Sequence, residues 1–166
     1  IARYLCQMAQ ENPDGMAIAA PDGTGWKRLS FAELDQRSSK LAAGLQKAGI
    51  GRGVRTLVMV RAGIELIVTT FALFKCGAVP ILIDPGMGLA SFLNCVARSQ
   101  PEAFIGIPLA HLARILFPGS FRSVRHTVTV GTRWLWGGHR LDQLEKAEIT
   151  ENIPVISAPD EVAAVL

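Results

Sequence analysis

Short apolar segments alternate with segments of helical period along most of this chain, and that alternation limits the folds it can adopt. Strands that are covered by helices on both faces are apolar throughout, instead of alternating between apolar and polar residues. Strand and helix in turn, with short connections, are typical of a parallel sheet layered with helices. We therefore predict the α/β class with a mostly parallel sheet. The expected strands are 56–60, 79–83, 103–107, 127–130 and 162 onward, and the expected helices are 62–76, 89–98, 109–116 and 141–146.

The part of the chain that precedes this sheet is predicted to form a helix, a hairpin and a second helix. Residues 2–11 have a helical pattern, and strands 16–20 and 26–29 flank a Pro-Asp-Gly-Thr-Gly segment that is typical of a hairpin loop. Ser30 and Glu33 have the spacing of a capping box, in which each side chain accepts a hydrogen bond from the other residue's backbone N–H. The helix that begins there is expected to turn one apolar face to the core, formed by Leu34, Leu41, Leu45 and Ala48.

The composition excludes several classes of protein. Of the 166 residues, 49% are hydrophobic and 19% are charged, which excludes intrinsic disorder. The longest weakly charged apolar stretch, 62–74, contains Glu65 and is shorter than the ~20 residues of a membrane-spanning helix. Three cysteines, Cys6, Cys76 and Cys95, form no Cys-x-x-Cys pair. We therefore expect reduced, buried thiols in a cytoplasmic protein, with neither a disulfide framework nor a zinc site.

Local signatures of catalysis are absent from the sequence. It contains no Gly-x-x-x-x-Gly-Lys-Ser/Thr phosphate loop, no Gly-x-Gly-x-x-Gly, no Gly-x-Ser-x-Gly and no His-Glu-x-x-His. His111, His126 and His139 are far apart and no carboxylate lies among them, so we expect neither a metal site nor a catalytic triad. We therefore assign no catalytic, nucleotide-binding or metal-binding residue to this chain.

One segment has a position that favours ligand contact. Asp84, Pro85, Gly86 and Met87 follow an apolar strand and precede a helix. Ligands of open α/β sheets bind at the carboxyl ends of the strands, so these four are the candidate substrate-binding residues. The same residue types also form turns, because Asp and Pro fix the backbone geometry and Gly allows a positive φ. Of the two readings, we favour the turn.

The charge is unevenly distributed. Residues 103–141 contain no carboxylate, although five arginines and all three histidines fall there, together with several aromatic residues. Such a combination can bind nucleic acid, an acidic protein, an anionic membrane or a CoA phosphate. The arginines do not recur at one helical or strand spacing, so we favour a solvated basic face and do not expect nucleic acid as a partner. We predict that Trp134 and Trp136 lie on an exposed loop, on either side of Leu135, and contact a partner protein or lipid.

Two motifs resemble those of the adenylate-forming (AMP-binding) superfamily, which includes acyl-CoA synthetases, luciferases and peptide-synthetase adenylation domains. Residues 29–34 (Leu-Ser-Phe-Ala-Glu-Leu) and 41–45 (Leu-Ala-Ala-Gly-Leu) resemble its first core motif. Residues 73–85 resemble the second, more specific motif, in which Leu-Lys-Ala-Gly-Ala precedes an apolar strand and Asp-Pro. The similarity covers essentially the whole chain. It implies part of the large N-terminal domain of an adenylate-forming enzyme.

Further residues narrow the branch of the superfamily. Residues 85–88, 92–93 and 100–106 are most similar to the enzymes of bacterial long-chain olefin biosynthesis. This resemblance implies a parent enzyme that uses ATP and Mg²⁺ to adenylate a β-hydroxy fatty acid, releases pyrophosphate, and then forms a β-lactone with release of AMP. A fatty acyl-CoA ligase shares the scaffold and is the alternative. A reading of another class is a non-catalytic α/β binding module that uses the basic and aromatic stretch 103–141.

The resemblance also implies where this chain stops. In the superfamily, the strand expected from residue 162 leads directly into the phosphate loop, and the groups that bind the nucleotide, Mg²⁺ and the acid follow it. Residues 1–166 are therefore expected to be the N-terminal portion of an AMP-binding domain that ends just before that loop. We expect the chain alone to be inactive and to hold no cofactor. Its expected partners in the parent are the C-terminal part of the same protein and a fatty-acid or β-hydroxy acid substrate.

Overall fold

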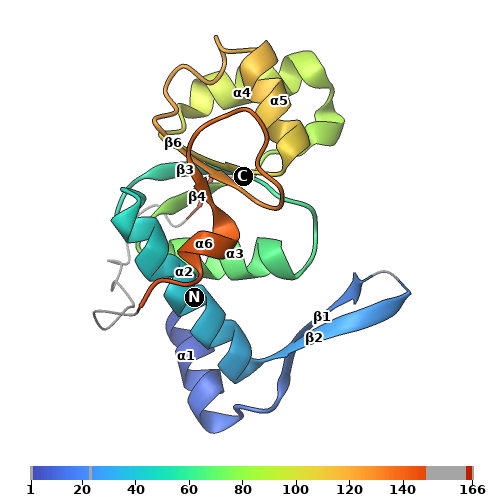
Figure 1. The fold of residues 1–166 in the computed structure, drawn as a ribbon, viewed down its shortest axis with the longest axis vertical. Helices are drawn as coiled ribbons and strands as arrows, with labels where there is room; N and C mark the ends of the chain where they lie inside the picture. Colours follow the sequence, from blue (N-terminus) through green and yellow to red (C-terminus); the bar gives the residue numbers. More distant parts are fainter. Residues whose placement is uncertain (1, 23, 149–163, 166) are drawn as a thin grey trace.

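The computed structural model describes residues 2–22, 24–148 and 164–165, which form two sheets and the helices around them (Figure 1). The chain begins with a helix, an antiparallel hairpin and a long helix; these are α1 (Ala2–Glu11), β1 (Met16–Asp22), β2 (Gly25–Ser30) and α2 (Phe31–Lys47). The second sheet has strands β3 (Arg55–Met59), β4 (Val79–Ile81), β5 (Ala103–Gly106), β6 (His126–Thr129) and β7 (His139–Arg140). Its connections contain α3 (Ile64–Lys75), the 3₁₀-helix η1 (Pro85–Met87), α4 (Leu89–Ser99) and α5 (Pro108–Leu116), and α6 (Leu141–Leu144) follows β7.

The five-stranded sheet is parallel throughout and is covered on both faces, as predicted. Its strands lie in the order β4-β3-β5-β6-β7. In Figure 1, α4 and α5 lie on one side of the sheet and α2, α3 and α6 on the other. Successive residues of one strand point to opposite faces, so Leu57 and Phe104 join one apolar cluster while Val58 and Ile105 join the other. Burial on both faces is the reason that these strands are apolar throughout.

The capping box predicted before the long helix is confirmed. The Glu33 backbone N–H donates to Ser30 Oγ at 3.3 Å, and the Ser30 N–H donates to Glu33 Oε2 at 2.8 Å. Two backbone donors at the start of α2 are thereby satisfied. The helix buries Leu34, Leu41 and Leu45 as expected, and Ala48 is half-buried.

A lysine of the second motif is buried between α2 and α3. The Lys75 side chain is 0% exposed. Its Nζ donates to Asp35 Oδ1 at 2.7 Å, to the Asp35 carbonyl at 2.8 Å and to Ser39 Oγ at 2.8 Å. All three donors of the ammonium therefore have acceptors. The pair joins the two long helices on one face of the sheet.

The structure corrects several details of the predicted elements. Strand β4 ends two residues before the expected 83, because the chain turns into η1, and β7 was not predicted at all. Most of the strand expected from 162 lies outside the described residues. Val165, which is described, pairs with β4 in parallel: its N–H donates to the Pro80 carbonyl and its carbonyl accepts from Leu82 N–H, both at 2.9 Å.

The cysteine prediction is only partly right. All three thiols are free, and Cys76 is buried at the end of α3, where burial raises its pKa to about 11. Cys6 and Cys95 are half-buried instead of buried. No helix among the described residues has both the length and the apolar character needed to cross a bilayer.

Helix α6 lies close against α2 at Gly44, so a larger residue at this position is expected to destabilise the fold. A Cβ at this position would overlap the backbone carbonyl of Leu144. Where a helix has open space around it, replacing glycine with alanine raises the stability by about 1 kcal/mol. Here the overlap outweighs that effect, and Gly44→Ala is expected to lower the free energy of unfolding by about 1–3 kcal/mol. Urea unfolding measures the difference. Gly51→Ala is the matched control, because the added methyl would meet nothing closer than Gln46 Cγ at 4.0 Å. Equal effects of the two substitutions would contradict the prediction.

Candidate functional site

The candidate site lies where the strand order of the parallel sheet reverses. The chain goes outward from β3 to β4 and then returns to β5 on the other side of β3. In sheets of this kind ligands bind at the carboxyl ends of the strands beside such a reversal. Two cavities open at this edge, and the segment that follows β3, residues 60–62, borders both of them. The position of the two cavities therefore follows from the topology of the sheet.

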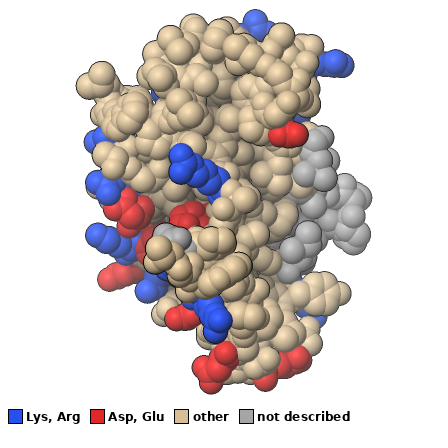
Figure 2. Space-filling view, turned by 90° about the vertical axis from the view of Figure 1, so that its right-hand side faces the viewer, with Lys and Arg blue, Asp and Glu red and all other residues tan. Residues whose placement is uncertain are grey.

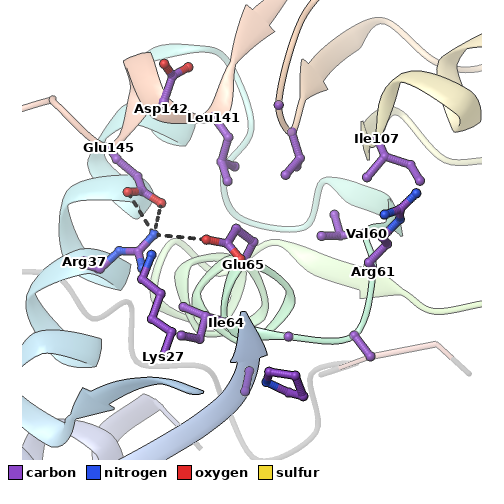
Figure 3. Close-up of a pocket in the computed structure, with 16 residues that line it drawn as sticks. Lys27, Arg37, Val60, Arg61, Ile64, Glu65, Ile107, Leu141, Asp142 and Glu145 are labelled. Carbon is purple, nitrogen blue, oxygen red and sulfur yellow. Dashed lines mark hydrogen bonds and ion pairs between the residues drawn. The ribbon is translucent and has the colours of Figure 1, made fainter. Parts of the chain in front are cut away.

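The first cavity has a volume of about 500 Å³ and is lined by charged groups on one side (Figure 3). Arg37 projects into it from α2, and its Nη2 donates to Glu145 Oε1 at 2.9 Å and to Oε2 at 3.2 Å. The same nitrogen lies 3.9 Å from Glu65 Oε1 on α3. Arg61 lies beside Ile107 on the other side of the cavity, and Lys27 comes from the hairpin. We call this the polar cavity.

The charges of the polar cavity largely neutralise one another. Arg37 is held by two carboxylates, so its guanidinium is already committed to this network. Among the residues that the structure describes, no three His, Cys, Asp or Glu side chains lie together so as to hold a metal ion. The arrangement therefore ties α2, α3 and the segment after α6 together at the mouth of the cavity.

The second cavity, of about 750 Å³, is bordered mostly by aliphatic side chains, and we call it the apolar cavity. It opens on the other side of residues 60–62, toward α4 and α5. Its charged lining residues are Arg61 and Asp84. A cavity of this kind accommodates an apolar ligand or the apolar side chains of a further protein segment. The aliphatic and aromatic lining comes from Val58, Met59, Val60, Leu66, Leu82, Ile83, Leu89, Phe92, Ile107 and Leu109.

Two of the four candidate substrate-binding residues line the apolar cavity. Asp84 and Pro85 line the apolar cavity, whereas Gly86 and Met87 are not among its lining residues. Asp84 Oδ1 accepts the Gly86 backbone N–H at 2.8 Å, which begins η1. The turn that we favoured for this segment is therefore confirmed. Contact of Asp84, Pro85, Gly86 or Met87 with a substrate stays a prediction.

The predicted exposure of the two tryptophans is right for Trp134 and wrong for Trp136, and contact with a partner protein or lipid stays a prediction. The Trp134 side chain is 58% exposed, and Leu135 between them is fully exposed. Trp136 is 8% exposed, because its ring stacks on His111 at 5.0 Å and its Nε1 donates to Thr129 Oγ1 at 2.9 Å. The loop thus has one aromatic ring in solvent and the other in the core.

The sequence analysis did not identify the burial of His111 or the ion pair between Arg37 and Glu145. His111 is completely buried, and burial lowers the pKa of its imidazole to about 4, with a further reduction from Arg114. Its Nε2 lies 3.1 Å from the Val128 carbonyl. The ion pair of the polar cavity joins Arg37 and Glu145, which are 108 residues apart, so no local pattern could have revealed it.

Residues 6–166 match the family of AMP-binding enzymes. This chain belongs to that family. The assignment confirms the resemblance of the two core motifs and covers nearly the whole chain.

Two curated members of the AMP-binding family resemble this chain over its full length. It is 47% identical over 174 aligned residues to an olefin β-lactone synthetase of Xanthomonas campestris pv. campestris, and 46% identical over 176 to one of Stenotrophomonas maltophilia. A salicyl-AMP ligase / salicyl-S-ArCP synthetase of Mycobacterium tuberculosis is 38% identical over 134 residues, which cover 76% of this chain. The chain spans 31%, 32% and 24% of these relatives' own lengths. It therefore corresponds to about a third of the two olefin β-lactone synthetases.

Solved structures of other ligases share the fold. A coronafacic acid ligase of Pectobacterium brasiliense superposes on 98% of this chain with a TM-score of 0.83 at 19% identity, and the matched part is 32% of that protein. A long-chain-fatty-acid-CoA ligase of Archaeoglobus fulgidus gives the same TM-score at 18% identity, with 98% and 33% covered. At these identities the likeness concerns the fold alone. It confirms the predicted α/β architecture of an AMP-binding N-terminal domain.

The AMP-binding family implies the use of ATP. That this chain holds no nucleotide-binding residue stays a prediction. The chain has no phosphate-loop sequence, and no acidic cluster that could hold Mg²⁺ is present in the described ranges. Of the charged groups that line the polar cavity, Arg37 is paired with Glu65 and Glu145. We therefore derive no step of the reaction through ATP or Mg²⁺ from these residues.

Proposed function

We propose that this chain is the N-terminal portion of an ATP-dependent, acid-activating ligase. The full-length enzyme is proposed to adenylate a β-hydroxy fatty acid with release of pyrophosphate, and to close the acyl-adenylate to a β-lactone with release of AMP. The observation that carries the proposal is the 46–47% identity to two olefin β-lactone synthetases over all of this chain. Mg²⁺ is expected to be required with ATP, and a cytoplasmic location, where ATP is available, belongs to the same proposal.

The part played by this chain is proposed to be structural support for the site. Parallel pairing of Val165 with β4 directs any following residues to the carboxyl edge of the sheet. Both cavities open at that edge. Residues after 166 are therefore well placed to complete a site there, with the phosphate loop and its lysine supplied by them. We accordingly propose that the chain ends just before this loop and is inactive alone.

The product of the full-length protein distinguishes this proposal from its alternative. We expect incubation with ATP, Mg²⁺ and a long-chain β-hydroxy acid to give a β-lactone and AMP, in an amount that CoA does not change. Mass spectrometry of the extracted lipid measures the product. Formation of an acyl-CoA, dependent on added CoA, would contradict lactone formation and support the fatty acyl-CoA ligase. The matched control is the same acid without its β-hydroxyl, which can be adenylated but cannot form the lactone ring.

The alternative to an enzyme is a non-catalytic binding module that uses residues 103–141. Against it stands the match of 6–166 to a family of enzymes. The burial of Trp136 also removes one of the aromatic rings that such a binding site would use. We therefore keep the ligase as the proposed function.

A further inference from the structure

The loop between β6 and β7, residues 130–138, joins two parts of the wall of the polar cavity. Its first two residues, 130 and 131, line the cavity, and so do Leu141, Asp142 and Glu145, which follow β7. The two ends of the loop lie side by side, because β6 pairs with β7. The conformation of this loop therefore bears on both parts of the wall.

A buried hydroxyl at the end of β6 holds the middle of the loop. The side chain of Thr129 is buried, and its Oγ1 accepts a hydrogen bond from Trp136 Nε1 at 2.9 Å. The same oxygen lies 3.3 Å from His111 Nε2 on α5. The indole of Trp136 stacks on the His111 ring, with an angle of 9° between the two planes. We call Thr129, Trp136 and His111 the loop latch.

The sheet fixes the imidazole on which Trp136 rests. His111 Nε2 lies 3.1 Å from the Val128 carbonyl of β6. A carbonyl oxygen can only accept, so this hydrogen bond places the ring proton on Nε2. Phe104 of β5 packs edge-on against the same ring, with the ring centroids 4.8 Å apart. The loop latch is thus anchored on two strands and one helix.

The groups of the loop latch are neutral at pH 7. They are a hydroxyl, an indole and an imidazole whose pKa is lowered to about 4 by burial, with a further reduction from Arg114 of the same helix. In Figure 2, most of the acidic side chains lie toward the end opposite α4 and α5. Because salt screens interactions between charges, a latch of neutral groups is expected to hold the loop at any ionic strength.

We propose that Thr129 is a positioning residue of the ligase. Its hydroxyl holds Trp136, and this contact keeps the loop, and the parts of the polar cavity wall on either side of it, in place. The inference rests on the proposed function, because it assumes that the reaction takes place at the carboxyl edge where the cavity opens. All three side chains of the loop latch are buried within the described residues, so their contacts do not depend on what packs against the surface.

Acid-dependent ATP–pyrophosphate exchange by the full-length protein tests the inference. Thr129→Val keeps the shape of the side chain, and Trp136→Phe keeps an aromatic ring on His111, but neither can form the hydrogen bond between the two residues. We expect each variant to lower kcat/KM for the acid about tenfold, and the double variant to lower it no further. Thr129→Ser keeps the hydroxyl and is expected to stay within about twofold of the wild type.

Hydrogen–deuterium exchange of the same proteins measures the loop itself. We expect peptides from residues 130–138 to take up deuterium faster in Thr129→Val and in Trp136→Phe, and at the wild-type rate in Thr129→Ser. Thr56→Val is the matched control, because it removes a buried hydroxyl from β3 of the same sheet, where Thr56 Oγ1 donates to the Val54 carbonyl at 3.2 Å. It is expected to change neither the loop nor kcat/KM. Thermal melting shows that each variant is folded.

Three outcomes with an active wild type would overturn the inference alone. One is that Thr129→Val and Thr129→Ser have the same kcat/KM. Another is that the effects of Thr129→Val and Trp136→Phe add in the double variant, as they would if the two residues acted separately. The third is faster deuterium uptake in the loop without any loss of kcat/KM, which would leave the loop latch a purely structural role. A folded wild type that catalyses no pyrophosphate exchange would instead contradict the proposed function, and the positioning role with it.

Discussion

Replacing Asp35 with alanine is expected to lower the free energy of unfolding by about 3–5 kcal/mol, because it leaves the buried Lys75 ammonium without its counterion. The Lys75 side chain has no exposed surface, and its Nζ lies 2.7 Å from Asp35 Oδ1. Only two neutral acceptors, the residue 35 carbonyl and Ser39 Oγ, would stay beside it. Burial of a charge with incomplete compensation is among the most destabilising changes in a protein core.

Two comparisons separate this effect from a general effect of charge. Lys75→Met is expected to cost less than Asp35→Ala, because the Asp35 side chain is 28% exposed and water can solvate it. Asp142→Ala removes an ion pair with Arg140 that is open to solvent, since the Arg140 side chain is 41% exposed and the Asp142 side chain 55%. It is expected to lower the free energy of unfolding by less than about 1 kcal/mol. Urea unfolding at neutral pH measures all three. An Asp35→Ala protein as stable as Asp142→Ala would contradict the proposed role of the buried pair.

Stability is expected to fall by about 3 kcal/mol between pH 6.5 and pH 4 through His111 alone. Burial lowers the pKa of this imidazole to about 4, while in the unfolded chain it keeps its ordinary value of about 6.5. Below pH 6.5 the unfolded state therefore binds more protons than the folded state, and the folded state loses stability until both are protonated. Above pH 6.5 both states are neutral and the group has no effect on the pH dependence.

The His111→Phe variant isolates this effect from the carboxylates that titrate in the same range. Phenylalanine keeps an aromatic ring against Trp136 and Phe104 but cannot bind a proton. The difference in unfolding free energy between wild type and variant is expected to change by about 3 kcal/mol in favour of the variant from pH 7 to pH 4. A difference that does not depend on pH would contradict the assignment.

The elements that could be predicted from the sequence are those set by local patterns. The apolar strands of the sheet, the helices between them and the capping box of Ser30 and Glu33 follow from residue type and spacing, and the structure has them. Strand β7 was missed because it has only two residues, His139 and Arg140, and is a strand only through pairing with β6. So short a segment carries no periodic signal.

The candidate site was less predictable for a different reason. Asp84 and Pro85 were found because they follow an apolar strand, and chain position alone places them at the carboxyl edge. The partners of Arg37 come from α3 and from the end of α6, and only folding brings these together. The burial of Trp136 likewise depends on His111, from a helix earlier in the chain. Tertiary contacts of this kind leave no mark on the local sequence.

Acid-dependent exchange of pyrophosphate into ATP by the full-length protein tests the central claim most directly. We expect the full-length protein with Mg²⁺ to catalyse exchange only when a long-chain β-hydroxy acid is added, and the 166-residue chain to catalyse none. This result would be that of an acid-activating enzyme whose catalytic groups lie outside the present chain. Absence of exchange by the folded full-length protein across a series of such acids would contradict the proposed function, and exchange by the 166-residue chain alone would contradict its role as structural support.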